Sequence, residues 1–134
     1  MRLALWPEGG EAEHLAEMEA FLEEPERYAQ FIAVAESGAA LGFVEASLRT
    51  DYVNGTESSP VAFLEGLYVE PTARRQGTAR ALVQAVVAWA KSRGCSELAS
   101  DTQLENVESQ AMHARLGFVE TERVVYFNMA LGSD

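Results

Sequence analysis

Residues 67–79 read Leu67-Tyr68-Val69-Glu70-Pro71-Thr72-Ala73-Arg74-Arg75-Gln76-Gly77-Thr78-Ala79, and this stretch decides the fold. Its pattern predicts a strand that Pro71 ends, a basic loop that reaches Gly77, and the start of a helix. The free backbone N–H groups at a helix N-terminus attract anions, and a glycine lets the main chain come close to a phosphate. The stretch therefore predicts a phosphate-binding loop. A solvated turn that happens to carry two arginines is the alternative interpretation.

The rest of the chain alternates between strand and helix patterns around this loop. Strands are expected, in chain order, at 31–36, 41–48, 61–69, 97–100 and 118–131, with a turn at Ser37-Gly38 between the first two. Helices are expected at 11–24, 78–92 and about 106–116. This order predicts an α/β (α+β) fold, in which helices cover a mixed sheet with two strand–helix–strand crossovers at its centre. The 134 residues are expected to form a single domain.

Three local features refine this expectation. Leu15, Met18, Phe21 and Leu22 share one face of the first helix and should pack inward, whereas His14 is expected to be solvated or to cap the helix. Gly66 interrupts the strand at 61–69, where a glycine commonly marks a bulge or a close approach by a ligand. The turn-rich segment 51–60 is the one long loop and a candidate binding loop.

Composition limits the choice of partner. The chain carries 21 acidic and 10 basic residues, a net charge of −11, which argues against nucleic acid and suits a cationic partner. No apolar run approaches the roughly 20 residues that span a bilayer, and Met1–Pro7 is too short for a secretory signal. We therefore expect no membrane partner and a cytoplasmic location. The lone Cys95 should be a small buried hydrophobe, and no metal site is expected.

Two motifs together resemble the GNAT superfamily of N-acetyltransferases. Arg74-x-x-Gly77-x-Ala79, preceded by Leu67-x-Val69-x-Pro71, is similar to the superfamily's acetyl-CoA pyrophosphate signature. Asn106-x-x-Ser109-x-x-x-His113-x-Arg115-x-Gly117-Phe118 resembles the conserved helix that follows it in that superfamily. The resemblance covers roughly residues 61–119, and it implies acetyl-CoA as the co-substrate.

The resemblance also implies roles for single residues. The backbone N–H groups from Arg75 to Arg80 would hold the pyrophosphate, and Asn106 would contact the pantetheine arm. The N–H of Leu67 would polarise the thioester carbonyl, and such donors are worth roughly 3 kcal/mol elsewhere. The implied cofactor-binding residues are Leu67, Val69, Arg74, Arg75, Gln76, Gly77, Thr78, Ala79, Arg80 and Asn106. His113 stands where the superfamily usually has a tyrosine, so it is either the general acid or a structural residue.

A narrower resemblance points to the aminoglycoside 6'-N-acetyltransferases. It rests on the segments 51–55, 58–60, 63–66, 99–101 and 120–124. In those enzymes an acidic cleft receives a polycationic sugar, and the implied substrate-binding residues here are Trp6, Tyr52, Glu65, Asp101 and Glu122. Asp101 and Glu65 would be catalytic carboxylates that bind the ammonium form and pass its proton to solvent. Packing by Trp6, loop anchoring by Tyr52 and solvation of Glu122 are the structural alternatives.

The sequence departs from the superfamily at its first strand, and it is also compatible with two further functions. The superfamily begins with a strand ahead of its first helices, whereas this sequence enters almost at once with Leu5-Trp6-Pro7. Either the start lies downstream of the true one, or this member lacks the strand, in which case residues 31–36 are expected to form an unprotected edge. The long terminal strand and the resemblance suggest a homodimer. Acetylation of a polyamine or a peptide amine would suit the same acidic cleft. A catalytically idle acyl-CoA-binding regulator would also have the phosphate loop.

Overall fold

The computed structural model describes residues 1–132, with the exception of the Leu3 side chain. The chain divides into two compact units, Met1–Asp101 and Thr102–Asp134. Among the described residues, the first unit holds the whole sheet, three α-helices and a short 3-10 helix, and the second holds one α-helix and an extended segment.

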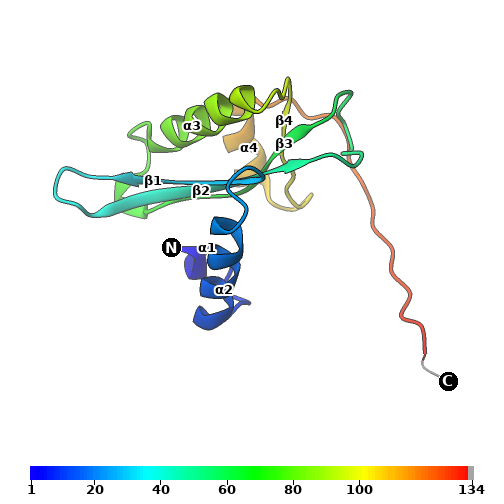
Figure 1. The fold of residues 1–134 in the computed structure, drawn as a ribbon, viewed down its shortest axis with the longest axis horizontal. Coiled ribbons are helices and arrows are strands. Elements are labelled where there is room, and N and C mark those ends of the chain that lie inside the picture. The colour runs from blue at the N-terminus through cyan, green and yellow to red at the C-terminus, as the bar shows by residue number, and fades with distance from the viewer. Residues whose placement is uncertain (133–134) are drawn as a thin grey trace. The chain divides into compact units, whose positions relative to one another are not determined.

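A four-stranded sheet forms the centre of the first unit (Figure 1). Its order is β1 (Tyr28–Val34), β2 (Ala40–Arg49), β3 (Val61–Val69) and β4 (Leu98–Ala99). The first three strands are antiparallel and β4 runs parallel to β3, which confirms the mixed sheet. The predicted hairpin joins β1 to β2, and β1 is an edge strand whose Ile32 and Val34 are exposed, as expected for 31–36.

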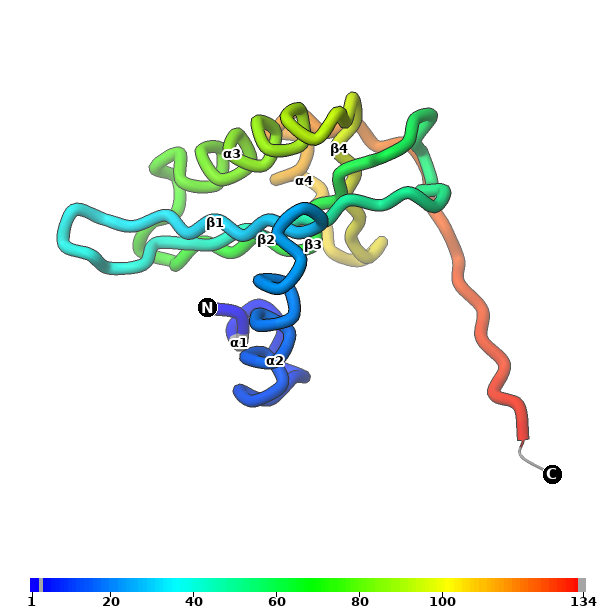
Figure 2. Tube along the Cα trace, in the orientation of Figure 1, coloured from blue at the N-terminus to red at the C-terminus, as the bar shows by residue number. Residues whose placement is uncertain are grey.

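Helices lie on both faces of this sheet (Figures 1 and 2). On one face, α3 (Thr78–Ser92) buries an apolar stripe made of Leu82, Val83, Val86 and Ala90, so the predicted helix is confirmed. On the other face lie α1 (Arg2–Leu5) and α2 (Glu11–Leu22). The short α1 was not expected from the sequence, because four residues are too few to show a helical period.

The pairing of β2 with β3 confirms the irregularity predicted at Gly66. Glu45 pairs with Gly66 and the next residue, Ala46, pairs with Leu64, so Glu65 is the extra residue of a β-bulge. The parallel pairing of β3 with β4 stops at Phe63, although β3 itself continues to Val69. The two strands therefore stop pairing two residues before the bulge. Within residues 1–132, the bulged half of β3 pairs only with β2.

The predicted inner face of α2 was wrong in part. Leu15 and Leu22 are 54% and 71% exposed, and the buried residue of the helix is His14, at 7% exposure. Burial of a histidine is favourable only when its ring nitrogens have partners. His14 has two, because α2 packs on the segment that follows α1 and meets the carbonyl of Trp6 there. The prediction that His14 is solvated or caps the helix is therefore wrong, whereas the predicted burial of Cys95 is confirmed.

The second unit contains α4 (Val107–Arg115), as predicted, but no terminal strand. Residues 118–132 are extended without a strand ladder, so the second crossover expected from the sequence is absent from the part of the chain that the structure describes. The segment exposes large apolar side chains at Val119, Val125, Tyr126, Phe127, Met129 and Leu131. A strand pattern fixes which side chains alternate, but a strand also needs a neighbour for its N–H and C=O groups. Here the described chain supplies none.

No helix among residues 1–132 is both long and apolar enough to cross a bilayer.

Candidate active site

The predicted phosphate loop lies between β3 and α3. A short 3-10 helix, η1 (Pro71–Ala73), leads out of the strand, and Gly77 is the N-cap of α3 with a left-handed φ of +81°. No side chain caps α3, so its first N–H groups are available to an anion. Arg75 also has a positive φ, 64°, which is uncommon for a residue other than glycine and occurs most often at functional loops.

Two side chains of the loop bond back to main-chain carbonyls of the same segment and so stabilise its conformation. Arg74 donates from Nε to the Val69 carbonyl at 3.0 Å, and Gln76 donates from its amide to the Thr72 carbonyl at 3.3 Å. A Cβ built on Gly77 meets no atom within 4 Å, which leaves open space in front of the helix. Uncapped N–H groups, basic side chains and open space fit a pyrophosphate.

Leu67 and Val69 lead from the bulge to this loop. They pair with Val44 and Gly42 of β2, one and three residues beyond Gly66. Leu67 is therefore placed where the prediction needed it, directly after the irregular part of the strand. Its role in polarising a thioester stays a prediction.

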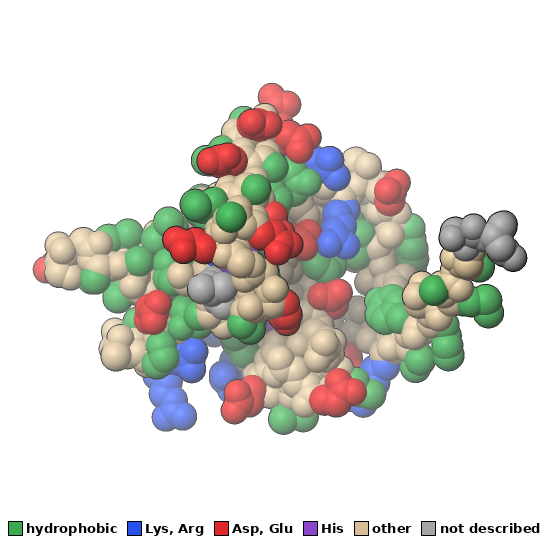
Figure 3. Space-filling view, turned by 90° about the horizontal axis from the view of Figure 1, so that it is seen from below, with side chains coloured by type: hydrophobic (Ala, Val, Ile, Leu, Met, Phe, Trp, Pro, Cys, Tyr) green, Lys and Arg blue, Asp and Glu red, His purple; other side chains and the backbone are tan. Residues whose placement is uncertain are grey.

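A pocket lies on the face of the sheet that α1 and α2 cover. Trp6 and Glu65 both line it, as predicted. Its lining combines α1, α2 and the central strands in the residues Arg2, Trp6, Gly9, Glu13, His14, Glu17, Phe21, Tyr28, Glu45 and Glu65. Figure 3 looks onto this side of the molecule, and acidic side chains are spread over it. A cationic ligand is the kind of molecule that such a lining suits.

Trp6 packs directly on the bulge. A Cβ built on Gly66 would clash with the Trp6 ring, so this strand position admits only glycine while the ring stays in place. Phe43 meets the ring edge-on at 6.1 Å, and the Arg2 guanidinium lies 4.8 Å from its centroid. Trp6 therefore packs on its neighbours, as the structural alternative expected. The same contacts hold its ring in the pocket wall.

A buried ionic cluster forms the floor of this pocket, and the sequence did not predict it. Arg2 makes ion pairs with Glu45 and Glu17, and Gln30 donates to the same Glu45 oxygen at 3.2 Å. Arg2 and Glu45 are 7% and 3% exposed. One signal could have revealed the cluster, because a glutamate at the centre of the apolar strand pattern at 41–48 must have a partner when buried.

His14 belongs to the same cluster, and its contacts assign its tautomer. The Nε of Arg2 can only donate, and it lies 3.4 Å from His14 Nδ1. The proton of a neutral His14 is therefore on Nε2, which donates to the Trp6 carbonyl at 2.9 Å. These two bonds connect Arg2 to the main chain that carries the Trp6 ring.

Glu65, the predicted acceptor carboxylate, is held by two donors. Ser47 donates from Oγ at 2.6 Å and Arg49 from Nη2 at 2.9 Å, both to Oε1. Ser47 is buried, and the Arg49 guanidinium lies 3.6 Å from the centroid of the Phe63 ring. Oε2 accepts no hydrogen bond from the described residues, so it keeps its acceptor capacity for a ligand.

Two further predicted residues of the first unit lie away from this pocket lining. Asp101 is exposed and lies two residues past β4, beyond the end of the pairing between β3 and β4. Tyr52 is 77% exposed and lines a second pocket together with Glu26, Arg27, Arg49 and Asp51. Trp6 and Glu65 therefore line one pocket, whereas Tyr52 lines the second pocket together with Arg49.

Three predicted residues lie in the second unit, and two of them, Asn106 and His113, have local partners there. Asn106 caps α4, accepting at Oδ1 from the Ser109 N–H at 3.1 Å. His113 donates from Nδ1 to the Ser109 carbonyl at 2.7 Å, so it could give up a proton at Nε2 only in its imidazolium form. Glu122 is an exposed residue of the extended segment. Their contacts with acetyl-CoA or an acceptor stay predictions.

Comparison with known proteins fits this geometry. The model of the acetyltransferase (GNAT) family matches residues 1–118. The chain belongs to this family.

Two similar relatives carry the same name. The chain is 55% identical over 132 residues to "Aminoglycoside N(6')-acetyltransferase type 1" of Serratia marcescens, covering 98% of this chain and 90% of that protein. It is 53% identical to the protein of the same name from Acinetobacter genomosp. 13, covering 98% and 89%.

Solved structures agree. The 6'-N-acetyltransferase AAC(6')-Ih of Acinetobacter baumannii superposes with a TM-score of 0.93 at 50% identity, over 98% of this chain and 88% of that one. AAC(6')-Iy, solved in complex with the bisubstrate analogue CoA-S-monomethyl-acetylneamine, superposes with a TM-score of 0.92 at 48% identity and the same coverage.

Proposed function

We propose that this protein is an aminoglycoside 6'-N-acetyltransferase, which transfers an acetyl group from acetyl-CoA to the 6'-amine of an aminoglycoside. The observation that carries the proposal is the bulge in β3. Its extra residue, Glu65, faces the acidic pocket on one side of the sheet, and the next residues of the same strand lead into the phosphate loop. Acceptor and co-substrate can therefore meet at Gly66. Relatives of the same name at 50 to 55% identity support the assignment.

Each residue has a defined task in this reaction. The N–H groups at the start of α3 bind the pyrophosphate, and the Leu67 N–H stabilises the negative charge that develops on the thioester oxygen. Glu65 binds the acceptor ammonium through Oε2. Asp101 takes the proton that the amine must lose before its nitrogen attacks the carbonyl carbon, and passes it to solvent. The C–S bond breaks as the amide bond forms, and the departing CoA thiolate takes up, through water, the second proton that the nitrogen loses. The reaction proceeds in a ternary complex without a covalent enzyme intermediate.

The direct test is release of CoA thiol from acetyl-CoA when kanamycin or tobramycin is added. We expect rapid release with these aminoglycosides and slow release with spermidine or a lysine-containing peptide. A preference for the polyamine or the peptide would replace the proposed acceptor. Binding of acetyl-CoA without release in the presence of any amine would identify a regulator rather than an enzyme.

The acceptor site can be tested separately through its charge. Exposed charges are screened over about 8 Å at physiological salt, so raising the salt concentration should increase the KM for kanamycin more than that for a simple monoamine. The Glu65→Gln and Glu122→Gln variants should each lose part of this salt dependence. A KM insensitive to salt and to both changes would remove the acidic site from the proposal.

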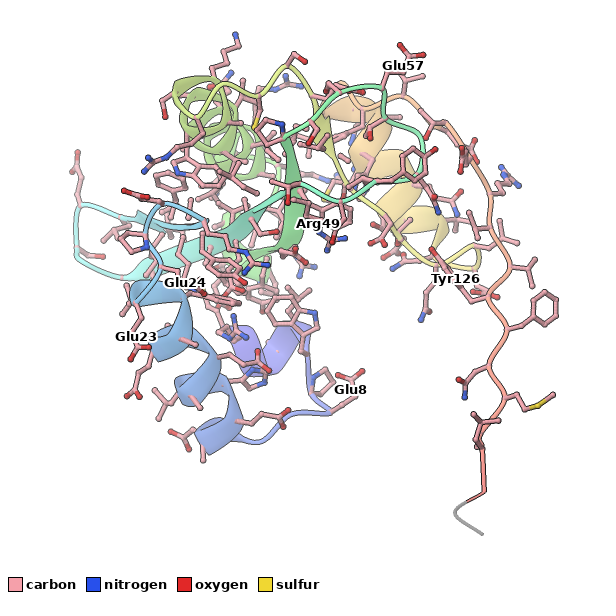
Figure 4. All side chains as sticks on the ribbon, turned by 45° about the vertical axis from the view of Figure 1, so that its right-hand side comes forward. Glu8, Glu23, Glu24, Arg49, Glu57 and Tyr126 are labelled. Carbon is pink, nitrogen blue, oxygen red and sulfur yellow. The ribbon has the colours of Figure 1, made fainter. Side chains whose placement is uncertain are left out.

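We also propose that two copies of the chain form a homodimer through residues 118–132. The support is the row of exposed apolar side chains in this segment, with Phe127 93% exposed and Leu131 86% exposed (Tyr126 is labelled in Figure 4). Contiguous exposed apolar surface is typical of an interaction site, and an extended segment can pair with a second chain. Light scattering should give a dimer mass, and Phe127→Lys should shift it toward a monomer. The cytoplasmic location stays a prediction from the sequence.

A further inference from the structure

Arg49 is a basic residue that connects the linings of the two pockets (labelled in Figure 4). It is the last residue of β2, and its side chain reaches over the Phe63 ring to Glu65. Glu65 lines the first pocket, whereas Arg49 itself lines the second. The ion pair between them therefore connects the lining of one pocket to the lining of the other.

The two pockets differ in charge because of where the arginines lie. In the first, one arginine, Arg2, faces four glutamates, and it is already paired with two of them. In the second, the arginines Arg27 and Arg49 balance the acids Glu26 and Asp51. A polycationic acceptor is consequently attracted into the first pocket, while Arg49 repels any ammonium group that approaches Glu65 from the second.

We propose that Arg49 is a specificity-determining residue that sets which amine of a polycationic acceptor is acetylated. It does so in two ways. With Ser47 it fixes Oε1 of Glu65, so that Oε2 alone receives an ammonium group. Its own charge also excludes the reversed orientation, in which the acceptor would reach the bulge from the side of Tyr52 and Asp51 and present a different amine. This inference rests on the proposed transfer to an aminoglycoside.

The test compares product positions and kinetics for Arg49→Met with kanamycin, which offers several amines. Methionine keeps the apolar stem over Phe63 and removes the charge. We expect a second monoacetylated isomer, resolved by NMR, and a kcat and a KM for kanamycin that fall together by about two- to fivefold, the range for one exposed charge pair. Acetyl-CoA affinity should not change. Arg49→Lys, which keeps the charge, should restore the single isomer.

Two further variants separate charge from positioning. Arg27→Met removes the same charge from the second pocket, but Arg27 pairs with Glu24 rather than with Glu65, so its product should remain a single isomer. Ser47→Ala removes the other donor to Glu65, which should lower kcat without a new isomer. A single unchanged isomer from Arg49→Met, or a second isomer from Arg27→Met as well, would overturn the role of Arg49. Absence of thiol release by the wild-type protein would instead reject the proposed function.

Discussion

The phosphate loop, which is proposed to bind acetyl-CoA, and the acidic pocket, which is proposed to bind the acceptor, are built in opposite ways. The loop is made of main chain from one continuous stretch, residues 69–80, and a left-handed glycine begins its helix. The pocket is made of side chains from α1, α2, β1, β2 and β3, which a network of ion pairs and stacked rings holds together. A substitution in the loop should therefore abolish acetyl-CoA binding without unfolding the protein. A substitution in the pocket should also lower the free energy of unfolding.

The largest effect should come from breaking the loop with Gly77→Glu. A left-handed φ disfavours any side chain, and a carboxylate there repels a pyrophosphate. We expect calorimetry to detect no binding of acetyl-CoA to the folded variant. Gly94→Glu is the matched control, because Gly94 has a similar φ of +84° and equally open space but ends α3 instead of beginning it. Retained binding in Gly77→Glu, or equal loss in both variants, would contradict a loop-specific site.

Breaking the buried ion pair of the pocket should instead lower the free energy of unfolding. Arg2→Met leaves the Glu45 carboxylate buried without its charged partner, which typically lowers the free energy of unfolding by about 3–5 kcal/mol. The double variant Arg2→Met/Glu45→Met removes both charges and should recover most of this loss. Urea denaturation measures both. If the single variant were as stable as the wild type, the pair would have no structural importance and the pocket floor would need another explanation.

A smaller effect confined to turnover should follow from Asp101→Asn. The residue is exposed and lies beyond β4, so stability should hardly change. Loss of a proton acceptor typically costs at least 100-fold in rate, so we expect kcat with kanamycin to fall by about that factor. The acetyl-CoA dissociation constant should stay the same, because the loop is untouched. Turnover like that of the wild type would move the proton transfer to another group or to water.

The smallest effect concerns the loop at 51–60 and depends on pH. Hydrogen bonds from the Ser58 hydroxyl and then from the Glu57 N–H hold the pKa of Glu97 below its ordinary value of 4.5. A carboxyl with a lowered pKa stabilises the fold above its unfolded pKa, and this contribution disappears as the pH falls through the folded pKa. Thermal denaturation should therefore show Glu97→Gln to be slightly less stable than the wild type at neutral pH.

The same comparison should vanish below the folded pKa of Glu97, where both side chains are uncharged. Ser100→Ala serves as a neighbouring change that leaves the titrating group in place, and its effect should not follow this pH dependence. A stability difference between Glu97→Gln and the wild type that stayed constant down to acidic pH would show that the carboxylate is not the anchor of this loop.

The contrast between the two regions also explains what the sequence could predict. The strand, the loop and α3 were predicted because proline, glycine and a helical apolar period act on neighbouring residues. The burial of His14 and the Arg2–Glu45 pair were missed, because each depends on a partner more than ten residues away that only the folded chain supplies. The strand expected at 118–131 was wrong for a related reason. Its alternating pattern is local, but a ladder requires a neighbour.

The contact between Trp6 and Gly66 links two positions that are sixty residues apart in the chain. Neither can be exchanged freely, because any side chain larger than hydrogen at position 66 displaces the indole, and a smaller residue at position 6 leaves the bulge without its cover. A mutant library that varies these two positions one at a time would therefore sample mostly damaged proteins. Paired substitutions, with a small residue at both, are the route by which an acceptor pocket of a different shape could arise on this scaffold.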